Sequence, residues 1–189
     1  MGVVLLIALV LAAIIAAGYL VGIYNQLVQV KVNVDKSWAN IEVLEKQRFD
    51  EIPKLVKVCE GYMQYERATL QKVIEARSRF LEAKGPADMA QASAEMGGAL
   101  KSLFALAEAY PDLKANQNFM QLQQRVTVLE NEIADRREFY NESVTINNTR
   151  IQQVPYVFLA GRLAMTAREM YKVDASERVA PEIKFAVPQ

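Results

Sequence analysis

The sequence contains no histidine and only one cysteine, Cys59, among its 189 residues. The lack of histidine excludes Ser-His-Asp and Cys-His catalysis, metal centres with imidazole ligands, and the Glu-x-x-His motif of di-iron helical bundles. A single cysteine cannot form an intrachain disulfide, so oxidative cross-links do not stabilise the chain. These absences argue against an enzyme, although carboxylate or lysine chemistry stays open.

Charged side chains are missing from the first part of the chain. Residues 1–30 contain no Lys, Arg, Asp or Glu, and all 22 basic and 22 acidic side chains occur from Lys31 onward. The net charge of zero and the lack of a basic patch argue against nucleic acid as a partner. The roughly 160 residues that follow suffice for one domain with a core.

The uncharged start is a long apolar run, VVLLIALVLAAIIAAGYLVGIY, from residue 3 to residue 24. A helix of this length covers about 33 Å, which matches the hydrocarbon core of a bilayer. Tyr19 and Tyr24 fall near its end, where aromatic rings favour the membrane interface. A cleaved signal peptide is the alternative, but it has a basic start and a shorter apolar run. We therefore predict a transmembrane anchor with its juxtamembrane segment in residues 1–30.

The residues after the anchor bear on its orientation and its continuity. Lys31 and Lys36 are the first charges, so the positive-inside bias places the C-terminal domain in the cytoplasm. The stretch VQVKVNVD, residues 28–35, alternates with the period of a strand. No helix breaker occurs between Gly22 and Pro53, so we predict a helix that runs from the membrane directly into the domain.

Residues 31–172 carry three long apolar stripes at helical spacing. They cover residues 38–80, 89–110 and 119–151, and Pro53 is expected to kink or break the first helix. Such stripes must bury one another. The predicted fold class is therefore all-α: a single transmembrane helix that continues into an elongated antiparallel bundle of three long helices plus a short C-terminal helix.

The stretch AYPDLKANQNFMQLQ joins the second stripe to the third. Pro111 cannot continue a helix from within, and it disfavours helical dihedrals at Tyr110. Asn116 and Asn118 are both candidate N-caps for the next helix. The pattern predicts a turn between antiparallel helices, made by Tyr110, Pro111, Asp112, Leu113, Lys114 and Asn116.

Charged residues interrupt the apolar stripes at Glu66, Arg77 and Arg137. A buried charge needs a partner, so we predict structural ion pairs, either Glu66 with Arg137 or Arg77 with Glu130. The alternative is a carboxylate or metal site that uses Glu66, Glu130 or Glu132. We expect no catalytic residue, metal or cofactor.

Single residues on the stripes also carry predictions. Cys59 lies on the core stripe and is expected to be a small buried hydrophobe. Trp38, at the start of the first bundle helix, is expected to be a packing anchor near the membrane, with a contact to another chain as the alternative.

The C-terminal part has an amphipathic pattern. Tyr156, Leu159, Leu163, Ala167 and Met170 share a face at helical spacing, with the basic residues Arg162, Arg168 and Lys172 beside or opposite it. We expect a short helix that caps the bundle; an interfacial helix that docks on a membrane or a partner is the alternative. Residues 173–189 contain two prolines and mixed charge, which predicts an extended tail.

Several ordered blocks resemble the LemA family. YPDLKANQNFMQLQ is similar to the most diagnostic block of the family, and YNQLV, SWANIEV, IPKLV, ERATLQKVIEAR and REFYNESV match further blocks. Asn148 also fits the family's spacing to Pro155. LEKQRFDE and the C-terminal YVFLAGRLAMTAREMYKV depart from the pattern. The resemblance implies a single-pass bacterial membrane protein with a cytoplasmic helical bundle and no established enzymatic activity.

These observations favour a scaffold or adaptor without catalysis, which self-assembles or recruits partners at the bacterial inner membrane. The expected partners are the lipid bilayer, further copies of the chain and an unidentified membrane or cytoplasmic protein. A magnetosome membrane protein resembles the same family. The alternative is therefore a membrane-shaping protein that acts through ordered oligomers and a basic amphipathic C-terminal helix.

Overall fold

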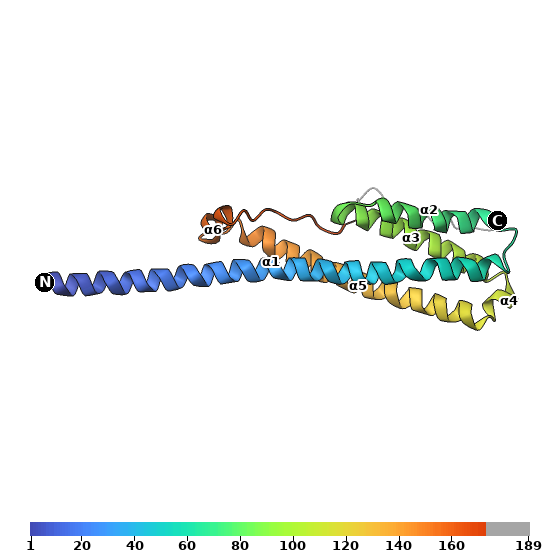
Figure 1. Cartoon of the computed structure of the whole chain (residues 1–189), viewed down its shortest axis with the longest axis horizontal. Helices are drawn as coiled ribbons and strands as arrows, with labels where there is room; N and C mark the ends of the chain where they lie inside the picture. The colour runs from blue at the N-terminus through green and yellow to red at the C-terminus, as the bar shows by residue number, and fades with distance from the viewer. Residues whose placement is uncertain (173–189) are drawn as a thin grey trace, which may run out of the picture.

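A computed structural model describes residues 1–172 as an elongated set of six helices (Figure 1). The helices are α1 (Gly2–Glu60), α2 (Arg67–Glu82), α3 (Gly85–Ala107), α4 (Pro111–Lys114), α5 (Gln117–Arg150) and α6 (Tyr156–Arg162). The described residues contain no strand, and this confirms the all-α fold class with an apolar N-terminal helix. The extended tail predicted for residues 173–189 lies outside the described residues.

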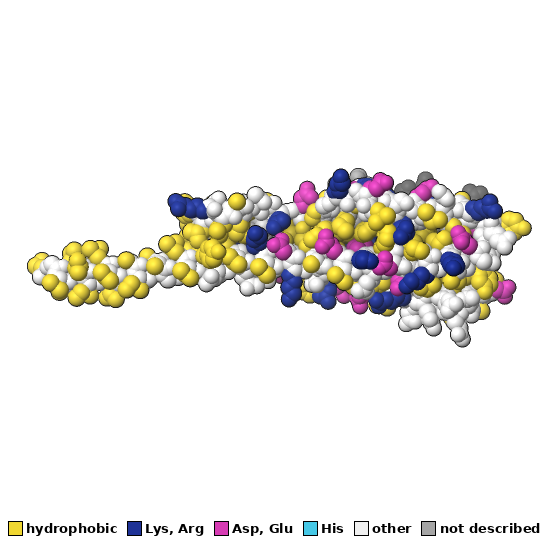
Figure 2. All heavy atoms as spheres, viewed as in Figure 1, with side chains coloured by type: hydrophobic (Ala, Val, Ile, Leu, Met, Phe, Trp, Pro, Cys, Tyr) yellow, Lys and Arg dark blue, Asp and Glu magenta, His cyan; other side chains and the backbone are white. Residues whose placement is uncertain are grey.

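Helix α1 is continuous over 59 residues, or about 88 Å at 1.5 Å per residue. Residues 28–35 are helical, as predicted, although their apolar residues alternate. Residues 1–21 are exposed along their whole length and project beyond the other helices as an apolar stalk (Figures 1 and 2). By length and composition, α1 is the one helix among the described residues that could cross a membrane.

Pro53 lies inside α1 and does not break it, so a break at this position was a wrong prediction. Proline removes one backbone donor, but Ile52 and Leu55 on either side are fully buried, and their packing holds the helix together across that gap. The chain reverses at residues 61–66 instead, and the first stripe is divided between α1 and α2. Met63 in this loop is fully buried, which explains why the apolar spacing continues across the break.

The second half of α1 packs along α5, which runs in the opposite direction, and the α2–α3 hairpin packs beside this pair (Figure 1). Three apolar clusters follow one another along the rod. The proximal cluster contains Ile23, Leu27 and Ala160, and the central cluster contains Val34, Ile41, Ala90, Tyr140, Val144 and Tyr171. The distal core, farthest from the N-terminus, is built around Leu55, Met96, Leu100, Leu103 and Phe119.

The C-terminal helix is shorter than its amphipathic pattern predicts. Helix α6 ends at Arg162, and residues 165–172 follow without regular secondary structure. Ala167 and Met170 therefore do not share a helix face with Tyr156. Helix α6 packs on α1 in the proximal cluster, as expected for a helix that caps the bundle.

Candidate functional site

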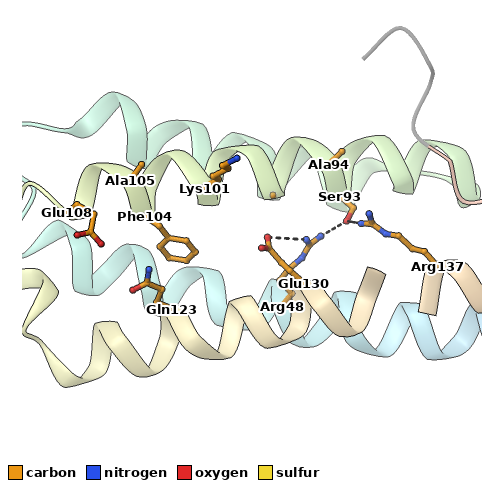
Figure 3. A pocket seen from close by; sticks show the side chains of 11 residues that line it. Arg48, Ser93, Ala94, Lys101, Phe104, Ala105, Glu108, Gln123, Glu130 and Arg137 are labelled. Atoms are coloured by element: carbon orange, nitrogen blue, oxygen red, sulfur yellow. Dashed lines mark hydrogen bonds and ion pairs between the residues drawn. The ribbon is translucent and has the colours of Figure 1, made fainter. Parts of the chain in front are cut away.

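Charged and polar side chains meet inside the bundle, between α1, α3 and α5 (Figure 3). Glu45 and Arg48 of α1 are only 1% and 3% exposed. Ser93 of α3 is buried beside them, and Arg137 of α5 and Tyr171 of the C-terminal segment complete the contacts. Together with Glu130, these residues are named the polar cluster.

The Glu45 carboxylate is the main hydrogen-bond acceptor of the polar cluster. It accepts from Arg48 Nη2 at 2.5 Å, from Ser93 Oγ at 2.6 Å and from Tyr171 Oη at 2.9 Å. Ser93 Oγ accepts in turn from Arg48 Nη2 and Arg137 Nη2, both at 2.6 Å. A buried carboxylate with three donors and an adjacent guanidinium is well compensated for its loss of water.

Two longer ionic contacts balance the charges. Arg137 Nη2 lies 3.8 Å from Glu45 Oε1, and Arg48 Nη1 lies 3.8 Å from Glu130 Oε1. The polar cluster thus holds two charges of each sign. Glu130 and Arg137 also line an open groove of about 570 Å³ between α3 and α5, which gives water partial access to them but not to Glu45.

Burial shifts the pKa of two residues of the polar cluster. It raises the pKa of the Tyr171 hydroxyl to about 12, and the nearby Glu45 carboxylate adds to this shift. Burial also raises the pKa of Glu130, although Arg48 and Arg137 oppose that change. The Arg137 guanidinium lies 4.8 Å from the Tyr171 ring centroid, so it stacks on the ring as well as pairing with carboxylates.

Both predicted ion pairs are wrong. Glu66 accepts a hydrogen bond from the Tyr110 hydroxyl at 3.1 Å, which ties the loop after α1 to the turn before α4. Burial, with a contribution from Glu66, raises the pKa of Tyr110. The Arg77 guanidinium stacks on the Phe49 ring, 3.9 Å from its centroid, instead of meeting an acid on α5.

Glu130 and Arg137 do make ionic contacts, but their partners come from α1. Glu45 and Arg48 were not predictable as members of the site, because acidic and basic residues three apart on a helix are typical of a solvated face. Ser93 and Tyr171 gave no signal either. One signal was available in the sequence. Glu45 and Arg48 follow Ile41 and precede Ile52 at intervals of three or four residues, so they lie on the same face of α1 as these two isoleucines, which are fully buried.

The predicted turn closes the distal end of the bundle. Its proline begins α4, and Leu113 is fully buried in the distal core. Asn116, rather than Asn118, caps α5: its Oδ1 accepts from the Phe119 amide at 3.1 Å, and its Nδ2 donates to the Tyr62 hydroxyl at 3.0 Å. Asp112 and Lys114 are exposed. The turn thus has a structural role in joining three segments.

Two asparagines of α5 hold the extended C-terminal segment, residues 166–171. Asn141 donates to the Tyr171 carbonyl at 3.0 Å and accepts from the Tyr171 amide at 2.8 Å. Asn148 makes the same pair of bonds to Arg168, at 2.9 and 2.8 Å. Seven helical residues rise about 10.5 Å and three extended residues about 10 Å, so the two spacings match. Asn141 and Asn148 are named the asparagine clasp.

Side chains fix the register of this segment. Arg168 forms an ion pair with Asp35 of α1 at 3.1 Å, and the Tyr140 hydroxyl donates to the Glu169 carbonyl at 2.8 Å. The Trp38 ring lies 5.2 Å from Tyr140 and 6.1 Å from Tyr171, measured between centroids. Trp38 is therefore a packing anchor, as expected.

The remaining basic residues of the predicted contact surface differ from Arg168. Arg162 and Lys172 are exposed, so a contact of either with a membrane or a partner stays a prediction. The interfacial-helix alternative is contradicted, because the backbone after Leu163 is extended and bound to α5.

The single cysteine and the acidic side chains decide whether the described residues could hold a metal ion. Cys59 is fully buried, and burial raises its pKa to about 11, so it is a neutral thiol in the distal core, as predicted. Within residues 1–172 no three Cys, Asp or Glu side chains are grouped so that they could hold a metal ion.

These features define a class of protein: a helical bundle on one long apolar helix, whose own C-terminal segment is bound along its side. The model of the LemA family matches residues 37–185, and the chain belongs to the LemA family. It is 26% identical to Protein LemA of Metamycoplasma hominis, over 84% of this chain and 73% of that protein. It is 23% identical to the magnetosome proteins MamQ 1 and MamQ 2 of Paramagnetospirillum magneticum, over 88% of this chain and 69% of each relative.

Proposed function

We propose that this protein is a membrane-anchored scaffold or adaptor that self-assembles or recruits partner proteins at the bacterial inner membrane, without catalysis. The observation that carries the proposal is the continuity of α1, whose exposed apolar N-terminal part runs into the bundle without a break. A stiff connection of this kind holds the bundle at a fixed height and angle to the bilayer. Lys31 and Lys36 favour a cytoplasmic bundle.

An exposed apolar surface on the bundle supports self-assembly. Val43 of α1 and Phe139 of α5 are each 56% exposed, and they line one groove of about 460 Å³. Glu132, Asp135 and Arg136 line the same groove, so it carries charges of both signs. Exposed apolar side chains beside charged ones are a composition that protein contacts use, and mixed charges allow a second copy to bind the groove.

Light scattering of the full-length protein in detergent tests self-assembly. We expect a discrete oligomer, and we expect the double variant Val43→Glu, Phe139→Glu to shift it toward the monomer. Leu81→Glu is the matched control, because Leu81 is exposed on α2, away from this groove. A monomeric wild-type protein would contradict self-assembly and leave recruitment of another protein, which crosslinking in the native membrane would identify.

Membrane shaping has weaker support. The names of two relatives associate them with magnetosomes, but the basic amphipathic helix that would act on the lipid is absent from residues 156–172. The scaffold reading depends only on α1 and on the exposed bundle surface.

A further inference from the structure

The C-terminal segment is bound to the bundle in the way that a peptide ligand is bound. The asparagine clasp forms four hydrogen bonds to its backbone, at Arg168 and Tyr171. Asn147 Nδ2 adds a fifth to the Thr166 carbonyl at 3.3 Å. Backbone bonds supply affinity, and alternate side chains supply specificity, as in other complexes of extended peptides. Here Tyr171 enters the polar cluster and Arg168 pairs with Asp35.

A short hinge separates this segment from the rest of the chain. Ala164 lies between α6 and residue 166, is exposed, and has a φ of 50°. This left-handed conformation is strained for a residue other than glycine, and the turn is closed by the Met165 amide, which donates to the Ala160 carbonyl at 3.0 Å. Opening the chain at Ala164 would relieve that strain at the cost of this bond. Helix α6 is held separately in the proximal cluster, and the distal core makes no use of the segment. The segment can therefore leave its site while both stay packed.

We propose that, in the assembled protein, residues 166–171 of one copy occupy the clasp of a second copy. The inference rests on the self-assembly proposed above and adds a second contact to the groove of Val43 and Phe139. The exchanged segment regains every bond that it makes in its own chain, because the two sites are identical. The bonds seen within one chain therefore show how the segment of a second copy would fit the clasp.

The membrane anchor brings neighbouring copies into a position where exchange can occur. Because α1 continues rigidly from the span into the bundle, two copies in one bilayer hold their hinges and their clasps at the same height. A segment that leaves one hinge then meets the neighbouring clasp in register. Confinement in the membrane also raises the effective concentration of neighbouring sites.

Crosslinking between two tagged copies of the full chain tests the exchange. One copy carries Asp35→Cys and the other Arg168→Cys, and the membranes are treated with a short thiol-reactive crosslinker. We expect a product that carries both tags, because these positions face each other across the clasp. A single chain with both substitutions is the control for reactivity. Crosslinks only within that control chain, with no mixed product, would overturn the proposal.

A pair of hinge variants adds a second measurement. Ala164→Gly removes the strain of the left-handed residue, worth roughly 1 kcal/mol, so the mixed product should fall about fivefold. Ala164→Val increases that strain and should raise the yield. A discrete oligomer without mixed product would reject exchange and keep the proposed self-assembly, whereas a monomer without mixed product would reject both.

Discussion

The distal and central parts of the bundle are held together by different forces. The distal core is almost entirely apolar, with Phe119, Leu103 and Met96 fully or nearly fully buried. The central part depends on the polar cluster and the asparagine clasp. Apolar burial has no preferred direction, whereas ion pairs and hydrogen bonds require one geometry. We infer that the distal core supplies most of the stability and that the central part specifies where the C-terminal segment binds.

The largest expected effect comes from the distal core. Phe119→Ala removes a ring that is 2% exposed and packs edge-on against Phe104, with 6.3 Å between ring centroids. The free energy of unfolding should fall by about 4 kcal/mol, from lost burial and the cavity that remains. Denaturant unfolding in detergent measures it, with the exposed neighbour Met120→Ala as the control. Similar losses in both variants would contradict the importance of the distal core.

The next effect tests the geometry of the polar cluster. Glu45→Gln keeps the shape of the side chain but removes its charge, so Arg48 and Arg137 lose a buried counter-charge. The free energy of unfolding should fall by about 3 kcal/mol. Equal stability of the variant and the wild type at neutral pH would refute this role of Glu45.

Glu130→Gln is the matched control for Glu45→Gln. Burial raises the pKa of Glu130, so folding makes its neutral form relatively more favourable than it is in the unfolded chain. The stability from this group is fully present below its unfolded pKa and is lost as the pH rises through its folded pKa. Glutamine mimics the neutral form, so at neutral pH this variant should be at least as stable as the wild type.

The clasp should give a smaller and more local effect. Asn148→Ala removes two hydrogen bonds to Arg168, which should lower the free energy of unfolding by about 2 kcal/mol. Hydrogen exchange at the Arg168 amide should accelerate while exchange in the distal core changes little. Asn118→Ala, an exposed asparagine at the other end of α5, is the control. Equal acceleration in both parts of the bundle would argue against a separable segment.

The difference between the apolar distal core and the polar central part also explains which features the sequence could predict. Periodic apolar residues revealed the helices, because burying a stripe requires only a repeated spacing. Asn116 was predictable as a cap, because that bond is local. The reversal at residues 61–66 was hidden by the buried Met63, which continues the spacing without continuing the helix.

The central part was not predictable, because its partners are distant in the sequence. Glu45 meets Ser93 and Tyr171 across separations of 48 and 126 residues. Nothing near Tyr171 indicates that asparagines of α5 bind its backbone and keep it extended. Contacts between residues so far apart in the sequence become visible only in the three-dimensional structure.

The smallest expected effect on stability comes from Tyr171, and its dependence on pH tests whether this residue is buried in the polar cluster. Tyr171→Phe removes one of three donors to Glu45, so stability at neutral pH should fall by about 1 kcal/mol. Burial, with a contribution from Glu45, raises the pKa of Tyr171 to about 12, so the folded state favours the neutral hydroxyl more than the unfolded state does. That contribution is complete below pH 10 and is lost as the pH rises toward 12. The wild type should therefore lose more stability than the variant in alkaline unfolding experiments, and parallel curves would show that Tyr171 is not buried against Glu45.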